Sequence, residues 1–234
     1  MTRSSPSKPR APARRRAPGR PAGKAKRAGG SDPRAQLLDA AIACFVRTGI
    51  AATTLREIAR EARVTPALLN YYFGDKAKLQ AALVEERLMP MLALLREPLQ
   101  QAGDDVGASI AAFVGGITRL AAEHPWLPPL WVREVRCEGG ALRDVLFERV
   151  GPVVPRMMAA RFAAAQARGE LNDDLDPRLL MVSLVGLTLF PIAGAPIWRR
   201  LFEDGAPGEA GRAPDFDGLR RHTLALLGHG IGTA

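Results

Sequence analysis

Signals that begin and end short helices recur between residues 31 and 85, and they constrain the fold more than any other feature of the chain. Asp32, Thr54 and Thr65 each precede a helix start, and proline follows Asp32 and Thr65. Such side chains accept hydrogen bonds from the free N–H groups of a first turn, and proline suits the first helical position. Thr54 and Glu57 have the spacing of a capping box. We therefore expect three short, closely spaced helices, with Gly49 ending the first in a left-handed conformation.

Helical patterning continues along the rest of the chain. A fourth helix is expected from Lys76, with Pro90 or Pro98 kinking or ending it. Residues 203–213 are rich in Gly and Pro and are expected to form a loop. No stretch alternates β-branched and polar residues, so no sheet is expected. The predicted fold class is all-α, with further helices over about 106–123, 126–137, 140–168 (broken near Gly151-Pro152), 177–198 and 214–229.

The positive charge of the chain is concentrated at its N-terminus. The net charge is +9, yet residues 1–30 hold ten basic residues and no acidic one, which leaves 23 basic against 24 acidic residues from 31 to 234. This tail is rich in Pro and Gly and lacks large apolar residues after Met1, so it is predicted to be disordered. The predicted domain division is therefore a basic tail over 1–30, a first helical domain over 31–80 and a larger helical domain over 81–234.

Three roles are open for the tail. It lacks the apolar stretch of a secretory signal. Its Arg and Ser content resembles an organelle transit peptide, but five prolines in the first 21 residues oppose the amphipathic helix that such a peptide needs. A solvated tail with no role is the second possibility. Nonspecific binding to phosphate is favoured over both.

Residues 179–198 form a run of 20 residues without a charge. Its length would admit a membrane span. Pro191 and Pro196 interrupt its second half, however, and Asp176-Pro177 begins it as an ordinary helix of a soluble protein. A helix that is apolar all round is otherwise buried in a core or against a partner subunit. We favour burial and expect no membrane partner.

The second and third expected helices, joined by a short turn, have the layout of a helix-turn-helix, in which one helix crosses the DNA backbone and the next enters the major groove. The sequence TTLREIAREARVTPALLNYYFGDKAKLQAALVE, residues 53–85, resembles the DNA-binding domain of TetR-family (TetR/AcrR type) transcriptional regulators. The resemblance is strong over about residues 33–85 and only architectural beyond. It implies an N-terminal three-helix reader of double-stranded DNA followed by a larger helical domain for ligand binding and dimerisation.

The resemblance also implies roles for single residues. Thr54 and Arg56 would meet backbone phosphate, with Arg56 near base edges. The recognition helix would begin with Thr65, Pro66, Ala67 and Leu68, while Tyr71, Tyr72 and Lys76 would contact phosphate or the groove wall. Hydroxyls, phenols and a lysine at a helix N-terminus are suitable phosphate donors. Pro66 and Ala67 offer only methyl-type contacts, so recognition would rest partly on DNA shape.

Two positions depart from the family pattern. Arg63 occupies a turn position where glycine is usual, and it is either a further phosphate contact or simply solvated. Asn70 stands where tyrosine is frequent. It could pair with an adenine if it points into the groove, but we favour a capping or packing role. The two adjacent tyrosines cannot both face inward on one helix, so at least one is expected to meet DNA.

In the resembled family the C-terminal part forms a homodimer and encloses an effector. Dimerisation would use the helices over about 177–194 and 214–229, packed as a four-helix bundle across a two-fold axis. Methionine and aromatic side chains make adaptable apolar pocket walls, although each is more often plain core. The pocket candidates are Met89, Phe113, Ile117, Trp126, Trp131, Phe147, Met158 and Phe162.

Nothing in the sequence supports catalysis. The three histidines have no metal-ligand spacing, the acids at 173–176 have the character of a solvated helix start, and Cys44 and Cys137 suggest neither a disulfide framework nor a zinc site. We expect no catalytic residues, metal or cofactor, and a cytoplasmic location. The favoured hypothesis is a repressor that a small apolar or amphipathic effector releases from an inverted-repeat operator. The alternatives are an architectural DNA-binding protein with no ligand response, and an enzyme or membrane protein with an accidental motif.

Overall fold

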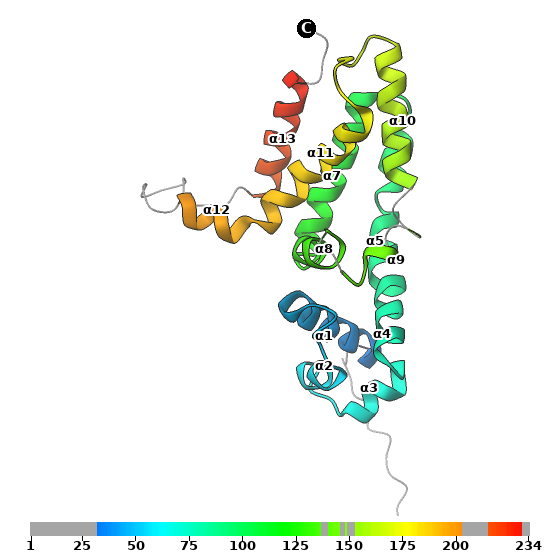
Figure 1. Cartoon of the computed structure of the whole chain (residues 1–234), viewed down its shortest axis with the longest axis vertical. Coiled ribbons are helices and arrows are strands. Elements are labelled where there is room, and N and C mark those ends of the chain that lie inside the picture. The colour runs from blue at the N-terminus through cyan, green and yellow to red at the C-terminus, as the bar shows by residue number, and fades with distance from the viewer. Residues whose placement is uncertain (1–31, 137–139, 146–147, 149–152, 203–214, 231–234) are drawn as a thin grey trace, which may run out of the picture. The chain divides into compact units, whose positions relative to one another are not determined.

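The computed structural model describes residues 32–136, 140–145, 148, 153–202 and 215–230 (Figure 1). These residues form helices joined by turns and loops, with no strand among them, which confirms the all-α fold class. The predicted tail over 1–30, the loop over 203–213, Cys137, Phe147 and the break at Gly151-Pro152 lie outside the described residues.

The first four helices begin where the sequence predicts. They are α1 (Pro33–Thr48), α2 (Leu55–Glu61), α3 (Pro66–Phe73) and α4 (Lys76–Leu83). An oxygen of the Asp32 side chain accepts from the Arg34 N–H at 3.0 Å, and those of Thr65 and Asp75 accept from Leu68 and Lys78 at 3.3 and 2.8 Å. Gly49 ends α1 with a φ of +87°, a region that glycine occupies without steric cost.

These helices share one apolar core. Leu37 and Phe45 of α1, Ile58 of α2, Leu69 of α3 and Leu79 of α4 are all fully buried in it. Because these residues recur at helical spacing, each helix turns one face inward and keeps its opposite face in solvent. That arrangement leaves the outer face of α3 free.

The segment after α4 differs from expectation. A π-helical turn, η1 (Val84–Leu88), leads into α5 (Met89–Ala93), and α6 (Arg96–Gln101) follows. Pro90 directly follows this π-helical turn, within a helical run that continues from α4 into α5, and Pro98 lies in the first turn of α6. The α-helical register of the fourth helix is thus interrupted just before Pro90, and the run ends at the turn over Leu94–Leu95, before Pro98; a kink at Pro90 itself stays a prediction.

The larger part of the chain contains α7 (Val106–Glu123), α8 (Leu127–Trp131), the π-helical η2 (Val132–Arg136), α9 (Arg143–Val145), α10 (Val153–Ala167), α11 (Pro177–Ala193), α12 (Ala195–Phe202) and α13 (Phe216–Gly230). Helix α7 packs against α10, α11 and α13 around a second apolar core that includes Phe113, Met158, Phe162 and Leu184. The predicted helix over 177–198 is divided at Gly194 into α11 and α12. Gly194 is buried, and a β-carbon there would lie 3.0 Å from Nε1 of the Trp198 indole.

Helix α7 is the one helix among the described residues that is long and apolar enough to cross a membrane. Half of it is buried within the protein, as expected for a central core helix, so its composition is weak evidence for a span. Within one chain, the uncharged run after Asp176 is partly buried, and its predicted burial against a partner subunit stays a prediction. Leu180 and Leu184 of α11 are buried, whereas Leu179 and Val182 are 63% and 66% exposed.

Candidate DNA-binding surface

Helix α2 begins with the capping box that the sequence predicts. The Thr54 hydroxyl accepts from the Glu57 N–H at 3.2 Å, and Glu57 Oε2 accepts from the Thr54 N–H at 2.7 Å and from its hydroxyl at 2.8 Å. The hydrogen bond from the Thr54 backbone N–H, followed by that from its hydroxyl, lowers the pKa of Glu57. Thr54 is thus engaged within its own helix start, while Arg56, two positions later, is exposed.

Helix α3 presents a polar and small-residue face to solvent. Pro66, Ala67, Asn70 and Tyr71 are exposed, whereas Leu69 and Phe73 are buried in the core. This division follows helical periodicity, because residues four positions apart share one face. Thr65, at the N-cap, is also exposed and accepts from the Leu68 N–H. Residues 65–67, 70 and 71 therefore form one continuous outer face, which we call the α3 outer face.

The two tyrosines lie in different environments. Tyr71 is 82% exposed. Tyr72 is half-buried and packs against the first core, and its ring meets that of Tyr71 edge-on with centroids 5.5 Å apart. This arrangement agrees with the argument that both cannot face inward. It leaves the Tyr71 phenol free to reach a nucleic-acid backbone.

Lys76 stands at the first position of α4, next to the N-cap Asp75. Its ammonium donates to the carbonyl oxygen of Ala51 at 2.8 Å, so it lies against the turn that joins α1 and α2. The hydrogen bond from the Lys78 backbone N–H lowers the pKa of Asp75, which therefore remains an ionised cap. Lys76 thus adds a positive charge where three of the helices converge.

The two departures from the family pattern have clear positions. Arg63 lies in the turn between α2 and α3 with a φ of +57°, the one non-glycine residue with a positive φ among those the structure describes. Its side chain is exposed. The Asn70 side chain is exposed on the α3 outer face, so the packing role favoured from the sequence is not what the structure shows.

Most of the predicted pocket residues lie in the second core. Met158 and Phe162 are fully buried, Phe113 and Ile117 are nearly so, and Trp131 packs at the edge. Trp126 packs against both cores, whereas Met89 packs only against the first. The structure therefore gathers six of these side chains around the second core and places Met89 elsewhere; Phe147 lies outside the described residues.

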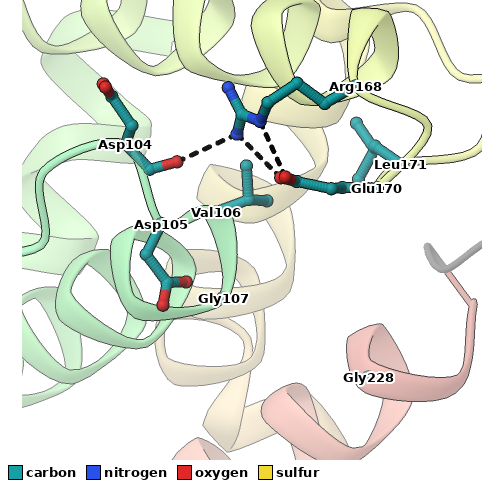
Figure 2. Close-up of a pocket in the computed structure, with 8 residues that line it drawn as sticks. All are labelled: Asp104, Asp105, Val106, Gly107, Arg168, Glu170, Leu171 and Gly228. Carbon is teal, nitrogen blue, oxygen red and sulfur yellow. Dashed lines mark hydrogen bonds and ion pairs between the residues drawn. The ribbon is translucent and has the colours of Figure 1, made fainter.

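The clefts found in the described structure lie away from those residues. Figure 2 shows one of them at the start of α7, where Arg168 forms an ion pair with Glu170 and donates to the backbone oxygen of Asp104. A second runs along α10 beside residues 173–178. Neither contains a predicted pocket residue, and the described residues hold no cluster of potential metal ligands.

Sequence reasoning missed one residue beside this surface. Glu134 of η2 is 4% exposed, and its carboxylate accepts from the Ile50 N–H at 2.9 Å, in the turn before α2. In sequence it is one acid in a Val-Arg-Glu-Val-Arg segment, a pattern typical of a solvated helix. Glu134 and Ile50 are 84 positions apart in the chain, so only the folded structure reveals their contact.

A capped helix, a tight turn and a second short helix with an exposed outer face together form a helix-turn-helix, the arrangement of a protein that reads DNA through the major groove. The sequence model of the family described as bacterial regulatory proteins, tetR family, matches residues 37–83. The HTH-type transcriptional repressor SCO4008 of Streptomyces coelicolor is 29% identical over 187 residues, which cover 80% of this chain and 88% of the relative.

Solved structures show the same fold. The ketosteroid transcriptional regulator KstR2 of Mycobacterium tuberculosis matches with a TM-score of 0.65 at 20% identity, over 88% of this chain and 97% of that one. The transcriptional regulator FadR of Bacillus subtilis, solved with stearoyl-CoA, matches with a TM-score of 0.59 at 19% identity, over 82% and 96% of the two chains. Residues 37–83 therefore match the tetR family of bacterial regulatory proteins, and the chain shares its helical fold with solved regulators. The chain is a DNA-binding transcription regulator and not an enzyme.

Proposed function

We propose that the chain acts as a homodimeric repressor that binds an inverted-repeat operator and leaves it when a small apolar or amphipathic molecule binds. The observation that carries the DNA-binding part is the α3 outer face: it presents Thr65, Asn70 and Tyr71 to solvent while Leu69 and Phe73 anchor the same helix in the core. An exposed recognition helix held by a rigid core is what base and backbone contacts require.

Each contact has a distinct role in this proposal. Tyr71 and Lys76 hold the DNA backbone, together with Thr54, Arg56 and Tyr72 at the margins. Asn70 gains a base-reading role, because its exposed amide can donate to and accept from the major-groove edge of adenine. Pro66 and Ala67 allow close approach and contact thymine methyl groups. Backbone contacts fix the register, whereas base contacts set the sequence.

An exposed apolar surface on α11 and α13 supports dimerisation. Leu179, Val182 and Phe190 of α11 are 63%, 66% and 53% exposed, and Leu226 of α13 is 52% exposed. The α11 residues share one face by their spacing, and α11 and α13 pack together (Figure 1). An exposed apolar patch of this kind marks an interaction surface. A two-fold axis through it would bury the patch of both copies and align two readers.

The effector proposal rests on the second core and on family likeness. FadR was solved with stearoyl-CoA, a molecule with a long apolar chain. Here Phe113, Met158 and Phe162 are buried together in the second core, and such Met and aromatic side chains make an adaptable lining for an apolar molecule. Trp131, at the edge of this core, is the best site for a test because its truncation opens no central cavity.

The DNA-binding part is tested with two variants of the proposed contacts. Lys76→Ala and Tyr71→Ala are expected to weaken binding to all duplexes, and Lys76→Ala should also reduce the slope of log affinity against log salt by about two, since a dimer loses two phosphate contacts worth about 0.9 each. Arg119→Ala removes a charge from an exposed site on α7 and serves as the control. Equal affinity and slope in all three variants would refute the assignment.

The effector part is tested by reciprocity. If a compound weakens DNA binding by some factor, operator DNA must weaken binding of that compound by the same factor, typically 5- to 150-fold. Trp131→Ala should change the concentration of compound that releases DNA. If release by every active compound is unchanged, the effector binds elsewhere. If no compound among apolar and amphipathic candidates releases DNA, the chain is the architectural alternative.

A further inference from the structure

Glu134 is a buried acid beside the first core. It lies in η2, is 4% exposed, and its carboxylate accepts from the Ile50 N–H at 2.9 Å and from the Ala141 N–H at 3.2 Å. A buried carboxylate is costly unless hydrogen bonds satisfy it. Its two backbone partners both lie at the first core but come from distant segments of the chain, since Ile50 follows α1 and Ala141 precedes α9. Glu134 therefore ties these two segments together.

The turn over residues 49–53 is shaped to receive this carboxylate. A β-carbon at Gly49 would lie 3.3 Å from Glu134 Oε1, so the absence of a side chain there allows the acid to approach. Inside the turn, the Thr53 hydroxyl donates to the Gly49 oxygen at 2.6 Å and lies 2.8 Å from the Thr48 hydroxyl. The turn is thus fixed internally by Thr53 and externally by Glu134.

The same turn holds Lys76. The Ala51 carbonyl oxygen accepts from the Lys76 ammonium at 2.8 Å, and Ala51 directly follows Ile50. A continuous series of contacts therefore runs from the Glu134 carboxylate, through the backbone of Ile50 and Ala51, to the ammonium group that we propose contacts phosphate. A shift of this backbone segment would move the Lys76 ammonium with it.

Further contacts place η2 against the first helices. Arg133 donates to the Val46 oxygen at 2.9 Å, near the end of α1, and Gln80 of α4 donates to the Ala141 oxygen at 3.3 Å. Arg133 and Glu134 lie in the π-helical turn η2, a geometry found frequently at functional sites. Glu134 is the buried acid at the centre of this contact region.

We propose that Glu134 is a positioning residue for DNA binding: it holds the turn over residues 49–53 so that Lys76 and the N-terminus of α2 meet the DNA backbone together. This inference rests on the proposed role of Lys76. Glu134 itself touches no DNA. It acts through the backbone of Ile50 and Ala51, and any movement of η2 is passed to the DNA-binding helices at this point.

The test uses Glu134→Gln in the full chain and a duplex selected from a random-sequence library by the unmodified protein. Glutamine has a single acceptor oxygen, so it cannot satisfy both the Ile50 and Ala141 N–H groups. Loss of a hydrogen bond to a charged acceptor is expected to weaken binding to this duplex roughly tenfold. Glu123→Gln, the same chemical change at an exposed position of α7, should leave the affinity unchanged.

A double-mutant cycle separates positioning from a general loss of stability. If Glu134 acts through Lys76, the effect of Glu134→Gln falls to less than about twofold in a Lys76→Ala background, because coupled residues are non-additive. Circular dichroism at the binding temperature confirms that each variant is folded. Amide hydrogen exchange at Ile50, measured without DNA, should be faster in Glu134→Gln. Additive effects of the two substitutions, or unchanged exchange at Ile50, would overturn the positioning role.

The outcomes also separate this inference from the proposed function. An unmodified protein that enriches no duplex contradicts the proposed function, and the inference falls with it. An unmodified protein that enriches a duplex, combined with additive effects in the cycle, leaves the proposed function intact and refutes only the role of Glu134.

Discussion

At the residue scale, the reader is defined by a few side chains with contrasting environments. Tyr71 is 82% exposed, while Phe73, two positions later, is 5% exposed. The Lys76 ammonium and the Glu134 carboxylate hold the turn over residues 49–53 through adjacent residues of one peptide segment. The polar groups of this region are therefore arranged by backbone contacts more than by ion pairs.

Arg63 has the least favourable backbone conformation among the described non-glycine residues. A left-handed φ costs a non-glycine residue about 1–2 kcal/mol, and glycine loses about 0.5–1 kcal/mol through extra freedom in the unfolded chain. Arg63→Gly should therefore raise the free energy of unfolding by about 0.5–1 kcal/mol, or the melting temperature by roughly 1–3 °C. Arg63→Ala removes the same charge but keeps the β-carbon, so it should show no gain. Equal stability of the two variants would show that the φ of Arg63 carries no strain.

Sequence patterns predicted the caps well and side-chain destinations less well. Asp32, Thr54 and Thr65 cap their helices as expected, because capping depends on residues within one turn. Capping signals could not predict that Asn70 is exposed or that Glu134 is buried. Both depend on how helices far apart in the chain pack. The sites of Met89 and Trp126 against the first core depend on the same packing.

At the scale of elements, helical register decides which residues meet. The π-helical turns η1 and η2 both carry polar contacts to α1: Glu86 and Arg87 of η1 pair with Arg34 and Asp39, and Arg133 of η2 donates to Val46. One extra residue in a turn changes the face that all later residues present. Local propensity gives no sign of such turns, so the sequence indicated a kink or end near Pro90 but not the register shift over Val84–Leu88 that precedes it.

Helix α11 offers a test of capping by pH. The Arg178 guanidinium, followed by its backbone N–H, lowers the pKa of the N-cap Asp176 from 3.8 to about 2. A carboxyl with a lowered folded-state pKa stabilises the protein above its unfolded pKa and loses this contribution as the pH falls through the folded value. Asp176→Asn keeps a capping side chain but cannot ionise.

The stability difference between wild type and Asp176→Asn should therefore be constant above about pH 4 and shrink toward pH 2, as measured by urea unfolding midpoints. Asp173→Asn, in the same loop, controls for the loss of an exposed charge. A difference that stays constant down to pH 2 would show that Asp176 does not cap through its charge.

At the scale of the whole molecule, charge and apolar surface are separated along the chain. Residues 31–80 hold seven basic and five acidic groups, a weak excess for a DNA-binding domain, whereas residues 1–30 hold ten basic groups and no acid. The exposed apolar residues of α11 and α13 lie far along the chain from both. We expect the tail to supply long-range attraction, the helix-turn-helix to supply register and sequence, and the C-terminal helices to set the spacing of two readers.

Deletion of residues 1–30 tests the role of the tail. A dimer would lose twenty cations, and each neutralised phosphate contributes about 0.9 to the slope of log affinity against log salt. The slope should flatten by roughly two units or more and nonspecific affinity at low salt should fall. The preferred operator sequence should persist, since disordered Arg and Lys contact the backbone. An unchanged slope would mean that the tail does not touch DNA.

The central claim is that two copies of this chain read one DNA site symmetrically, and the most direct measurement is a footprint on a selected duplex together with the mass of the complex. We predict two chains per duplex and protection of two inverted half-sites spaced by a whole number of helical turns, because one recognition helix contacts too few base pairs for useful specificity. A single bound chain with an asymmetric footprint, or no protected site, would contradict the account.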